Sequence, residues 1–261
     1  MDKENLRALV KTYYDFQDMR VRMANRLKKK KDGSDQVVID EINLDTEAIP
    51  VLVDMWQDLC ENEKRLLKEI ENELGAFAVY TQFLKNVKGC GPTMSAVIIS
   101  EYDIRRADTV SKLWQYTGLN PGMVRGKVVK GSKKDGTHKL VETDTLIRGD
   151  KKTPGFVAPF NSWLRSKMIG VLAASFLRSN SPYRKYYDDY KNRLENEERP
   201  VNGDPNNKKW CEVSKGRRDL AAKRYMIKMF LKDLYQAWRT LEGLPVRAPY
   251  AEEYLGRKHS A

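Results

Sequence analysis

Apolar residues recur with a helical period along most of this chain, and this pattern limits the fold to a mainly α architecture. The spacing predicts two long helices near the N-terminus, over residues 3–30 and 46–74. It also predicts a helix over residues 160–179 and a last long helix over residues 217–241. Residues 160–179 are apolar on nearly every side of a helix, so we expect this helix at the centre of the core.

Shorter elements complete the predicted fold. Four further helices are expected, over residues 76–87, 92–100, 109–117 and 182–197. In the middle of the chain the helical period is lost, and alternating runs at residues 124–130 and 137–141 flank the pair Asp135-Gly136. An Asp-Gly pair between such runs is typical of a hairpin turn, so we expect one small β-hairpin inserted among the helices.

The charge of the chain favours a polyanionic partner. The 261 residues include 48 Lys and Arg against 36 Asp and Glu, which gives a formal net charge of +12 and a pI near 9.4. Residues 1–75 hold 13 basic and 17 acidic side chains, whereas residues 76–261 hold 35 basic and 19 acidic ones. Residues 105–185 alone hold 17 basic and 5 acidic side chains. The polyanion-binding surface is therefore expected in the C-terminal two-thirds.

Composition excludes several classes of protein. The longest apolar stretches, such as Ala96–Ile99, are far shorter than the ~20 residues that a membrane-spanning helix needs, and residues 1–30 lack the apolar core of a signal peptide. Cys60, Cys90 and Cys211 are scattered, and the chain has only two histidines. We therefore expect a cytoplasmic protein with no membrane partner, no structural metal and no cofactor.

The most specific local signal is the segment Lys88-Gly89-Cys90-Gly91-Pro92. It resembles a helix-hairpin-helix motif, in which a Gly-hydrophobic-Gly turn joins two short helices. Glycines let a phosphate approach the backbone, and the N–H groups that open the second helix, around Thr93, lie at the positive end of its dipole. Lys85 and Lys88 add mobile charge, and Cys90 is expected to be a small buried hydrophobe. An ordinary corner between two helices, without a ligand, is the alternative.

The last helix, over residues 217–241, carries a cationic stripe beside its apolar one. With about 100° of rotation per residue, its basic side chains fall within about 80° of one another. These side chains are Arg217, Arg224, Lys228, Lys232 and Arg239. The pattern is typical of a solvated helix face, with phosphate contact, above all by Arg224 and Lys228, as the alternative.

Further candidates lie in the basic middle of the chain. Phosphate contacts are expected from Arg125, Lys127, Lys130, Lys133, Lys134 and Arg165. Four tyrosines at helical spacing are expected either to stack on nucleotides or to pack against the core. These are Tyr183, Tyr186, Tyr187 and Tyr190.

The domain organisation follows from these elements. Residues 1–75 are expected to form a helical hairpin or coiled coil for packing or homo-oligomerisation. The basic run Lys28–Lys31 precedes chain breakers that let the two helices fold back, with a phosphate-contacting arm as the alternative. Residues 76–245 are expected to form a helix-hairpin-helix DNA-binding domain, and residues 246–261 a tail.

Several motifs in one order resemble the C-terminal domain of the insertion-sequence transposases of family one hundred and ten, with its one-hundred-and-sixteen and nine-hundred-and-two relatives. The Gly-hydrophobic-Gly turn is followed by an apolar helix ending at Glu101 and by Tyr116-Thr117-Gly118-Leu119-Asn120-Pro121, which is similar to the family's Tyr-x-Gly-Leu-x-Pro turn. The other similar segments are Asn161–Arg165, Ser181–Tyr187 and Ala221–Lys228. The resemblance, over about residues 80–242, implies a DNA-binding protein of mobile-element or phage type.

The chain departs from this family in ways that bear on catalysis. Full-length members carry an N-terminal nuclease-like domain with a ribonuclease-H-type carboxylate set. Residues 1–75 are helical in pattern, so we expect that catalytic half to be missing. Members also use a serine as nucleophile, located between the Gly-Leu-x-Pro turn and the Asn-x-x-Leu-Arg helix. The resemblance therefore implies that Ser132, the only serine in that interval, is the catalytic residue. A hairpin-loop serine is the alternative reading of Ser132.

The sequence therefore favours a DNA-binding protein that contacts backbone phosphates through a helix-hairpin-helix, with little sequence preference. Two alternatives stay open. One is an active transposase or recombinase that uses Ser132 with a separate nuclease subunit, and magnesium is expected only in that case. The other is a regulatory module that binds structured RNA, because members of the resembling family work with a structured guide RNA.

Overall fold

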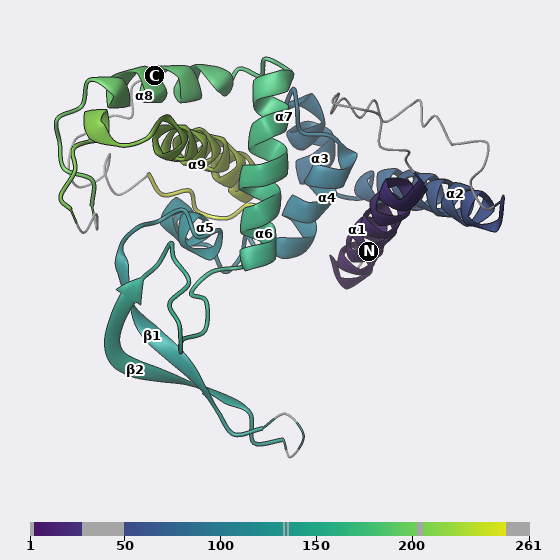
Figure 1. The fold of residues 1–261 in the computed structure, drawn as a ribbon, viewed down its shortest axis with the longest axis horizontal. Helices are drawn as coiled ribbons and strands as arrows, with labels where there is room; N and C mark the ends of the chain where they lie inside the picture. The colour runs from purple at the N-terminus through teal and green to yellow at the C-terminus, as the bar shows by residue number, and fades with distance from the viewer. Residues whose placement is uncertain (1–2, 28–49, 133, 135, 203–205, 249–261) are drawn as a thin grey trace.

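The helical period of the sequence is realised in a mainly α fold with one antiparallel β-hairpin, which confirms the predicted fold class (Figure 1). This computed structural model describes residues 3–27, 50–132, 134, 136–202 and 206–248. Lys28–Lys31 and most of the expected C-terminal tail lie outside these ranges. The described elements are α1 (Lys3–Leu27), α2 (Pro50–Leu74), α3 (Ala78–Gln82), the 3-10 turn η1 (Leu84–Asn86), α4 (Pro92–Glu101), α5 (Val110–Tyr116), β1 (Met123–Lys130), β2 (Lys139–Arg148), α6 (Ser162–Ser166), the π-helical segment η2 (Lys167–Leu172), α7 (Ala173–Arg178), α8 (Arg184–Glu195), the 3-10 turn η3 (Trp210–Glu212) and α9 (Lys215–Leu241).

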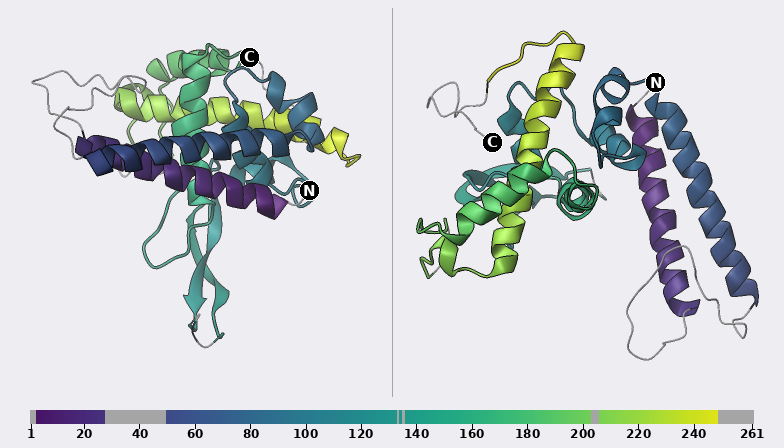
Figure 2. Two further views of the ribbon diagram at one scale, coloured as in Figure 1. Left: turned by 90° about the vertical axis from the view of Figure 1, so that its right-hand side faces the viewer. Right: turned by 90° about the horizontal axis from the view of Figure 1, so that it is seen from above.

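The N-terminal helices α1 and α2 lie side by side as the predicted helical hairpin (Figure 2). Leu6 and Val10 of α1 and Ile70 and Leu74 of α2 have no exposed surface. Because residues four apart lie on one face of a helix, each pair marks the buried face of its helix. These side chains belong to the same buried cluster as α4, α7 and α9, so the hairpin shares its core with the helices that follow.

The centre of the core is a continuous helical stretch formed by α6, η2 and α7. Four of its fully buried side chains are spaced four residues apart, namely Leu164, Met168, Leu172 and Phe176. The helix predicted over residues 160–179 is confirmed as the central one. It begins at Ser162 because the Asn161 side chain accepts a hydrogen bond from the Leu164 N–H at 3.0 Å and so caps the first turn.

The longest helix, α9, packs beside this central stretch. Its buried residues include Ala222, Met226, Phe230 and Leu234, none of which has exposed surface. The Ser214 side chain caps its first turn, which places the start of the helix two residues before the predicted one. No helix in the described ranges, α9 included, is long and apolar enough to cross a membrane.

The helix predicted over residues 76–87 is wrong in its length. α3 ends at Gln82, Phe83 has non-helical dihedral angles of φ −126° and ψ −65°, and only η1 follows. The Phe83 ring stacks on Phe230 of α9, with 6.5 Å between the ring centroids. Tertiary packing of one aromatic side chain therefore coincides with the break in the local helical pattern.

β1 and β2 form an antiparallel hairpin that projects from the helical body (Figure 1). Their pairing runs from Met123 opposite Arg148 to Lys130 opposite Lys139. The second strand is thus longer than predicted, because it continues past Val141 along the whole of β1. Each residue of β2 that faces β1 can form backbone hydrogen bonds with it, so the strand continues as far as its partner does. The alternation of side chains does not show where this pairing ends.

A glycine lies where the strand register shifts near the base of the hairpin. The pairing register shifts between Arg125 and Lys127, so Gly126 lies at a bulge. A Cβ on Gly126 would lie 2.5 Å from Phe156 Cδ1. The close approach of the Phe156 ring therefore requires glycine at this position of the strand.

Candidate nucleic-acid interface

The Gly-hydrophobic-Gly turn joins η1 to α4 and packs against the end of α7. Gly89 has a φ of +92°, which favours glycine. A Cβ on Gly89 would lie 2.5 Å from Ser179 Oγ and 3.0 Å from Phe176 Cδ1. Gly89 is therefore needed for packing against α7, and a substitution there would disturb the fold rather than test a ligand contact.

Gly91 has a different environment. It is exposed, it is the N-cap residue of α4, and Pro92 occupies the first turn. A Cβ on Gly91 would meet no atom within 4 Å, so the space beside the start of α4 is open. Lys85 and Lys88 are exposed on the segment that leads into this turn. The turn thus offers two lysines and an accessible helix N-terminus, which is a suitable combination for a phosphate.

Two residues of the turn point into the protein. Cys90 is buried, its Sγ lies 3.6 Å from Ser95 Oγ, and burial raises the pKa of the thiol to about 12. The expectation that Cys90 is a small buried hydrophobe is confirmed. Thr93 is half-buried, and its side chain interacts with Tyr13 of α1. The second helix of the motif is therefore held partly by the N-terminal hairpin.

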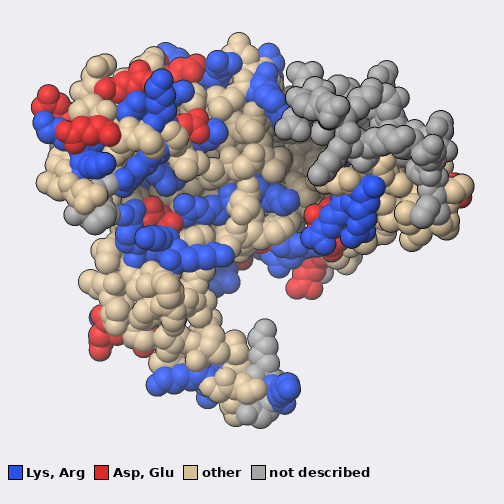
Figure 3. All heavy atoms as spheres, viewed as in Figure 1, with Lys and Arg blue, Asp and Glu red and all other residues tan. Residues whose placement is uncertain are grey.

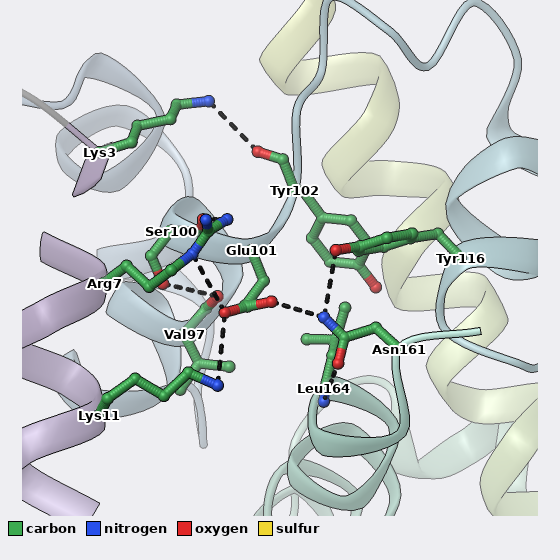
Figure 4. Close-up of polar contacts among 10 residues, drawn as sticks. All are labelled: Lys3, Arg7, Lys11, Val97, Ser100, Glu101, Tyr102, Tyr116, Asn161 and Leu164. Atoms are coloured by element: carbon green, nitrogen blue, oxygen red, sulfur yellow. Dashed lines mark hydrogen bonds and ion pairs between the residues drawn. The ribbon is translucent and has the colours of Figure 1, made fainter. Parts of the chain in front are cut away.

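Glu101 ends α4 and links three parts of the fold (Figure 4). Its side chain is only 6% exposed, and Oε1 lies 3.3 Å from Arg7 Nε and 3.7 Å from Lys11 Nζ of α1. Its Oε2 accepts a hydrogen bond from Nδ2 of Asn161, the N-cap residue of α6. The described residues contain no group of three or more His, Cys, Asp or Glu side chains that could hold a metal ion. Glu101 is thus a structural carboxylate.

A cationic cavity of about 330 Å³ lies between the base of the β-hairpin, the segment after α8 and the first half of α9. We call it the basic pocket. Its cationic lining consists of Arg148, Arg199, Arg217, Arg224 and Lys228, and the one carboxylate among its described lining residues is Asp150. Aromatic walls come from Tyr190, Trp210 and Tyr225. Figure 3 shows Lys and Arg side chains gathered on the face where the β-hairpin leaves the helical body.

Arg224 and Lys228 lie one turn apart on α9. Burial lowers the pKa of both side chains, and repulsion by Arg224 helps to lower the pKa of Lys228 to about 8. Lys228 Nζ lies 5.0 Å from the centre of the Trp114 ring, a cation–π contact. Within the described part of the chain, no carboxylate lies at ion-pair distance from either cation. The two charges are therefore held partly out of water, and the Asp150 carboxylate attracts both without forming a close ion pair with either.

The carboxylate of the basic pocket already has a partner. Asp150 accepts two hydrogen bonds from Arg148, at 2.9 Å from Nε and 3.0 Å from Nη2. The backbone carbonyl of Asp150 accepts a hydrogen bond from Arg165, which also donates to the Gly118 carbonyl at 2.8 Å. Arg165 was expected from the sequence to contact phosphate. Its Nη1 instead donates to both of these carbonyls and holds the backbone beside the pocket.

The basic residues of the β-hairpin are spread along an exposed ribbon rather than gathered in the basic pocket. Arg125 and Lys127 both lie near Glu142 of the opposite strand, with N–O distances of 3.6 Å and 3.9 Å. Lys130 is exposed at the end of β1. Exposed ion pairs of this kind contribute little to stability, so separating these side chains from Glu142 costs little free energy.

Ser132 lies in the exposed tip of the β-hairpin. Its Oγ accepts a hydrogen bond from the Lys134 N–H at 3.1 Å, and its own N–H donates to Thr137 Oγ1 at 3.0 Å. Lys134 is exposed, and Lys133 lies outside the described residues. No carboxylate or imidazole of the described residues contacts Ser132 Oγ. Its hydrogen bonds are those of a local turn.

The tertiary structure divides the predicted cationic stripe of α9. Arg217, Arg224 and Lys228 line the basic pocket, whereas Arg239 is only 5% exposed. The Arg239 guanidinium donates to three backbone carbonyls, those of Ile104, Ala107 and Pro245. Arg239 is therefore a structural residue and not part of a solvent-facing cationic surface.

Sequence reasoning missed Arg148 and Arg199, and with them the basic pocket. Arg148 ends β2, and Arg199 follows α8, so only the fold brings them to the face of α9. Two signals pointed to this region, namely the excess of basic residues between positions 105 and 185 and the cationic stripe of the last helix.

The tyrosines of α8 are engaged within the protein. Tyr183 donates a hydrogen bond to Asp233 at 2.9 Å, and Tyr187 donates one to Asp219 at 2.6 Å. Tyr190 stacks on Tyr225 of α9, with 4.5 Å between ring centroids. These contacts favour the packing alternative for Tyr183 and Tyr187, whereas Tyr190 lies at the wall of the basic pocket.

Comparison with known protein families finds a match to the middle of the chain. Residues 81–137 match the family model described as Transposase IS116/IS110/IS902 family. The matched segment contains the Gly-hydrophobic-Gly turn, α4, α5 and β1. The resemblance seen in the sequence is thereby confirmed for this segment, and the match supports a transposase-like function. No curated protein and no solved structure matches the chain.

Proposed function

We propose that this protein is a transposase-related DNA-binding protein that holds the phosphate backbone with little sequence preference. The observation that carries the proposal is the family match over residues 81–137, because that segment contains the exposed turn at the start of α4. The excess of basic residues in the C-terminal two-thirds supports the same conclusion, since phosphate neutralisation supplies most sequence-independent affinity for DNA.

The turn supplies the contacts that such binding needs. Gly91 leaves open space beside the N-terminus of α4, where backbone N–H groups and the helix dipole favour an anion. Lys85 and Lys88 are exposed close to it in the sequence and bring two further positive charges. Contacts of this kind position a duplex by its backbone and carry no base information.

A pair of charge reversals tests the turn. We expect Lys85→Glu combined with Lys88→Glu to weaken binding to duplex DNA at least tenfold, or about 1.4 kcal/mol, because two attractive contacts become repulsive. Electrophoretic mobility shift at fixed salt measures the affinity. The matched control is Lys64→Glu combined with Lys68→Glu, which changes the net charge equally at exposed positions of α2. If both double variants lose the same affinity for DNA, the loss comes from the change in net charge alone, and the turn has no role of its own.

The proposal assigns binding, and not strand cleavage, to the chain itself. We expect Ser132→Ala to leave DNA affinity within a factor of about three, because a hydroxyl in a solvated turn contributes little free energy. Nicking of supercoiled DNA with magnesium, together with trapping of covalent adducts, measures catalysis. A covalent adduct that forms with the unaltered protein and disappears in Ser132→Ala would instead establish a recombinase with a serine nucleophile.

A further inference from the structure

We propose that the basic pocket binds one unpaired nucleotide of a DNA strand, with the nucleotide's phosphate held by Arg224 and Lys228. This inference rests on the proposed function, because it adds a strand-end or junction contact to the backbone contacts of the turn. It assigns to the pocket a ligand class that neither the family match nor the turn implies.

The charges of the pocket call for an anion. Its described lining holds five cationic side chains and the single carboxylate of Asp150, which Arg148 already binds with two hydrogen bonds. Arg224 and Lys228 are partly buried, and within the described ranges Asp150 attracts both charges without lying at ion-pair distance from either. A cation that is removed from water without a close partner costs folding free energy. A phosphate that enters the pocket would supply a close partner for both cations at once.

The size and walls of the pocket favour a nucleotide over a bare phosphate. A cavity of about 330 Å³ falls at the small end of the range for organic ligands, so a lone phosphate would leave most of it to water. Trp210 lines the pocket and has no ring-stacking or cation–π contact within the described part of the chain. Its indole face is available to stack on a base, and base–aromatic stacking contributes about 1–3 kcal/mol per base.

The shape of the site favours an unpaired nucleotide over a duplex. The cationic side chains come from three parts of the fold, namely β2, α9 and the segment that follows α8. Together these parts surround a recess rather than a flat surface. A paired base cannot leave its stack to enter such a recess without an unpairing cost, which an unpaired base does not carry. A duplex bound at other cationic surfaces could therefore place a frayed or single-stranded end in the basic pocket.

The experiment compares the affinities for a blunt duplex and for the same duplex with a short unpaired thymidine extension. We expect the unaltered protein to bind the extended duplex about tenfold more tightly, as one stacked base and one bound phosphate imply. In Lys228→Met this preference should fall to nearly one, because the aliphatic stem remains and the charge is lost. The matched control Lys215→Met, an exposed position in the first turn of α9 outside the pocket, should keep the preference.

A stability measurement separates ligand binding from a structural role of Lys228. Burial and repulsion by Arg224 outweigh attraction by Asp150 and lower the pKa of Lys228 to about 8 from 10.5, so the folded state disfavours its charged form. That unfavourable contribution is fully present below about pH 8 and disappears as the pH rises towards 10.5. At pH 7, Lys228→Met should therefore melt at the same temperature as the unaltered protein or higher. A clearly lower melting temperature would assign Lys228 a structural role and overturn the inference.

The remaining outcomes distinguish this inference from the proposed function. If the unaltered protein binds both duplexes equally, the pocket does not take an unpaired nucleotide, although DNA binding stands. If it binds neither, the proposed function itself fails. Inorganic phosphate and thymidine monophosphate can each be added as competitors. If both remove the preference for the extension at the same concentration, the pocket binds a free anion and not a nucleotide. A tighter complex with an RNA extension than with the DNA extension would overturn the assignment to DNA.

Discussion

The affinity of this protein for duplex DNA is expected to fall by roughly 10³–10⁵ between 50 and 200 mM salt, if it neutralises about 6–10 phosphates. Each bound phosphate releases condensed counterions into solution, and added salt makes that release less favourable. Given the net charge of +12 and the excess of basic side chains after residue 75, we expect counterion release to be the main source of this affinity. The slope of log affinity against log salt concentration, measured by fluorescence anisotropy, gives the number of phosphates contacted.

Variants sharpen this measurement. Lys85→Glu combined with Lys88→Glu should make the slope shallower by about two units, since each lost phosphate contact removes about 0.9. The control substitutions Lys64→Glu and Lys68→Glu should leave the slope unchanged, because α2 is not part of the proposed interface. A salt response close to zero in the unaltered protein would point to a partner that is not a nucleic acid.

The second large effect is expected at Arg239. We expect Arg239→Met to lower the free energy of unfolding by about 3–5 kcal/mol, because three backbone carbonyls lose their donor in the core. The methionine keeps an apolar stem of similar length, so the loss reports on the hydrogen bonds rather than on a cavity. Urea denaturation followed by circular dichroism measures the change.

The matched control for Arg239 is Arg105, another arginine near the same end of the fold. The Arg105 side chain is 76% exposed and pairs with Glu242 at 3.2 Å. An exposed pair of this kind contributes about 0–1 kcal/mol, so Arg105→Met should be nearly neutral. A loss at Arg239 as small as that at Arg105 would show that the buried carbonyls find other donors. If Arg239→Met loses DNA affinity without losing stability, Arg239 contacts DNA as part of the cationic stripe and is not a structural residue.

The periodic parts of the fold were predictable because their information is local. The central helix, the N-terminal helical pair and α9 all follow from apolar residues spaced three and four apart. The turn before α4 was predictable for a similar reason, since Gly89 allows the positive φ that a tight turn needs and Pro92 fixes φ at the start of a helix. Burial of Cys90 followed from its place as the hydrophobic residue of the Gly-hydrophobic-Gly motif.

Contacts between distant segments were not predictable from the same patterns. Phe83 ends α3 early while its ring stacks on Phe230, and β2 extends to Arg148 because β1 offers a full partner strand. Glu101, at the end of an apolar helix, reads as solvated from its neighbours alone, yet α1 and the N-cap of α6 enclose it. In each case the deciding partner lies far away in the sequence.

The sequence by itself determined a mainly α fold, a basic C-terminal two-thirds and the family resemblance over the turn and α4, because periodicity, composition and short motifs are properties of neighbouring residues. Only the tertiary structure decided which cations act together. It buries Arg239 against carbonyls, and it brings Arg148 and Arg199 to Arg224 and Lys228 around one pocket. The physical reason is that the energy of a charge depends on its exposure and on its nearest partners, and both are set by the packing of segments that the chain places far apart.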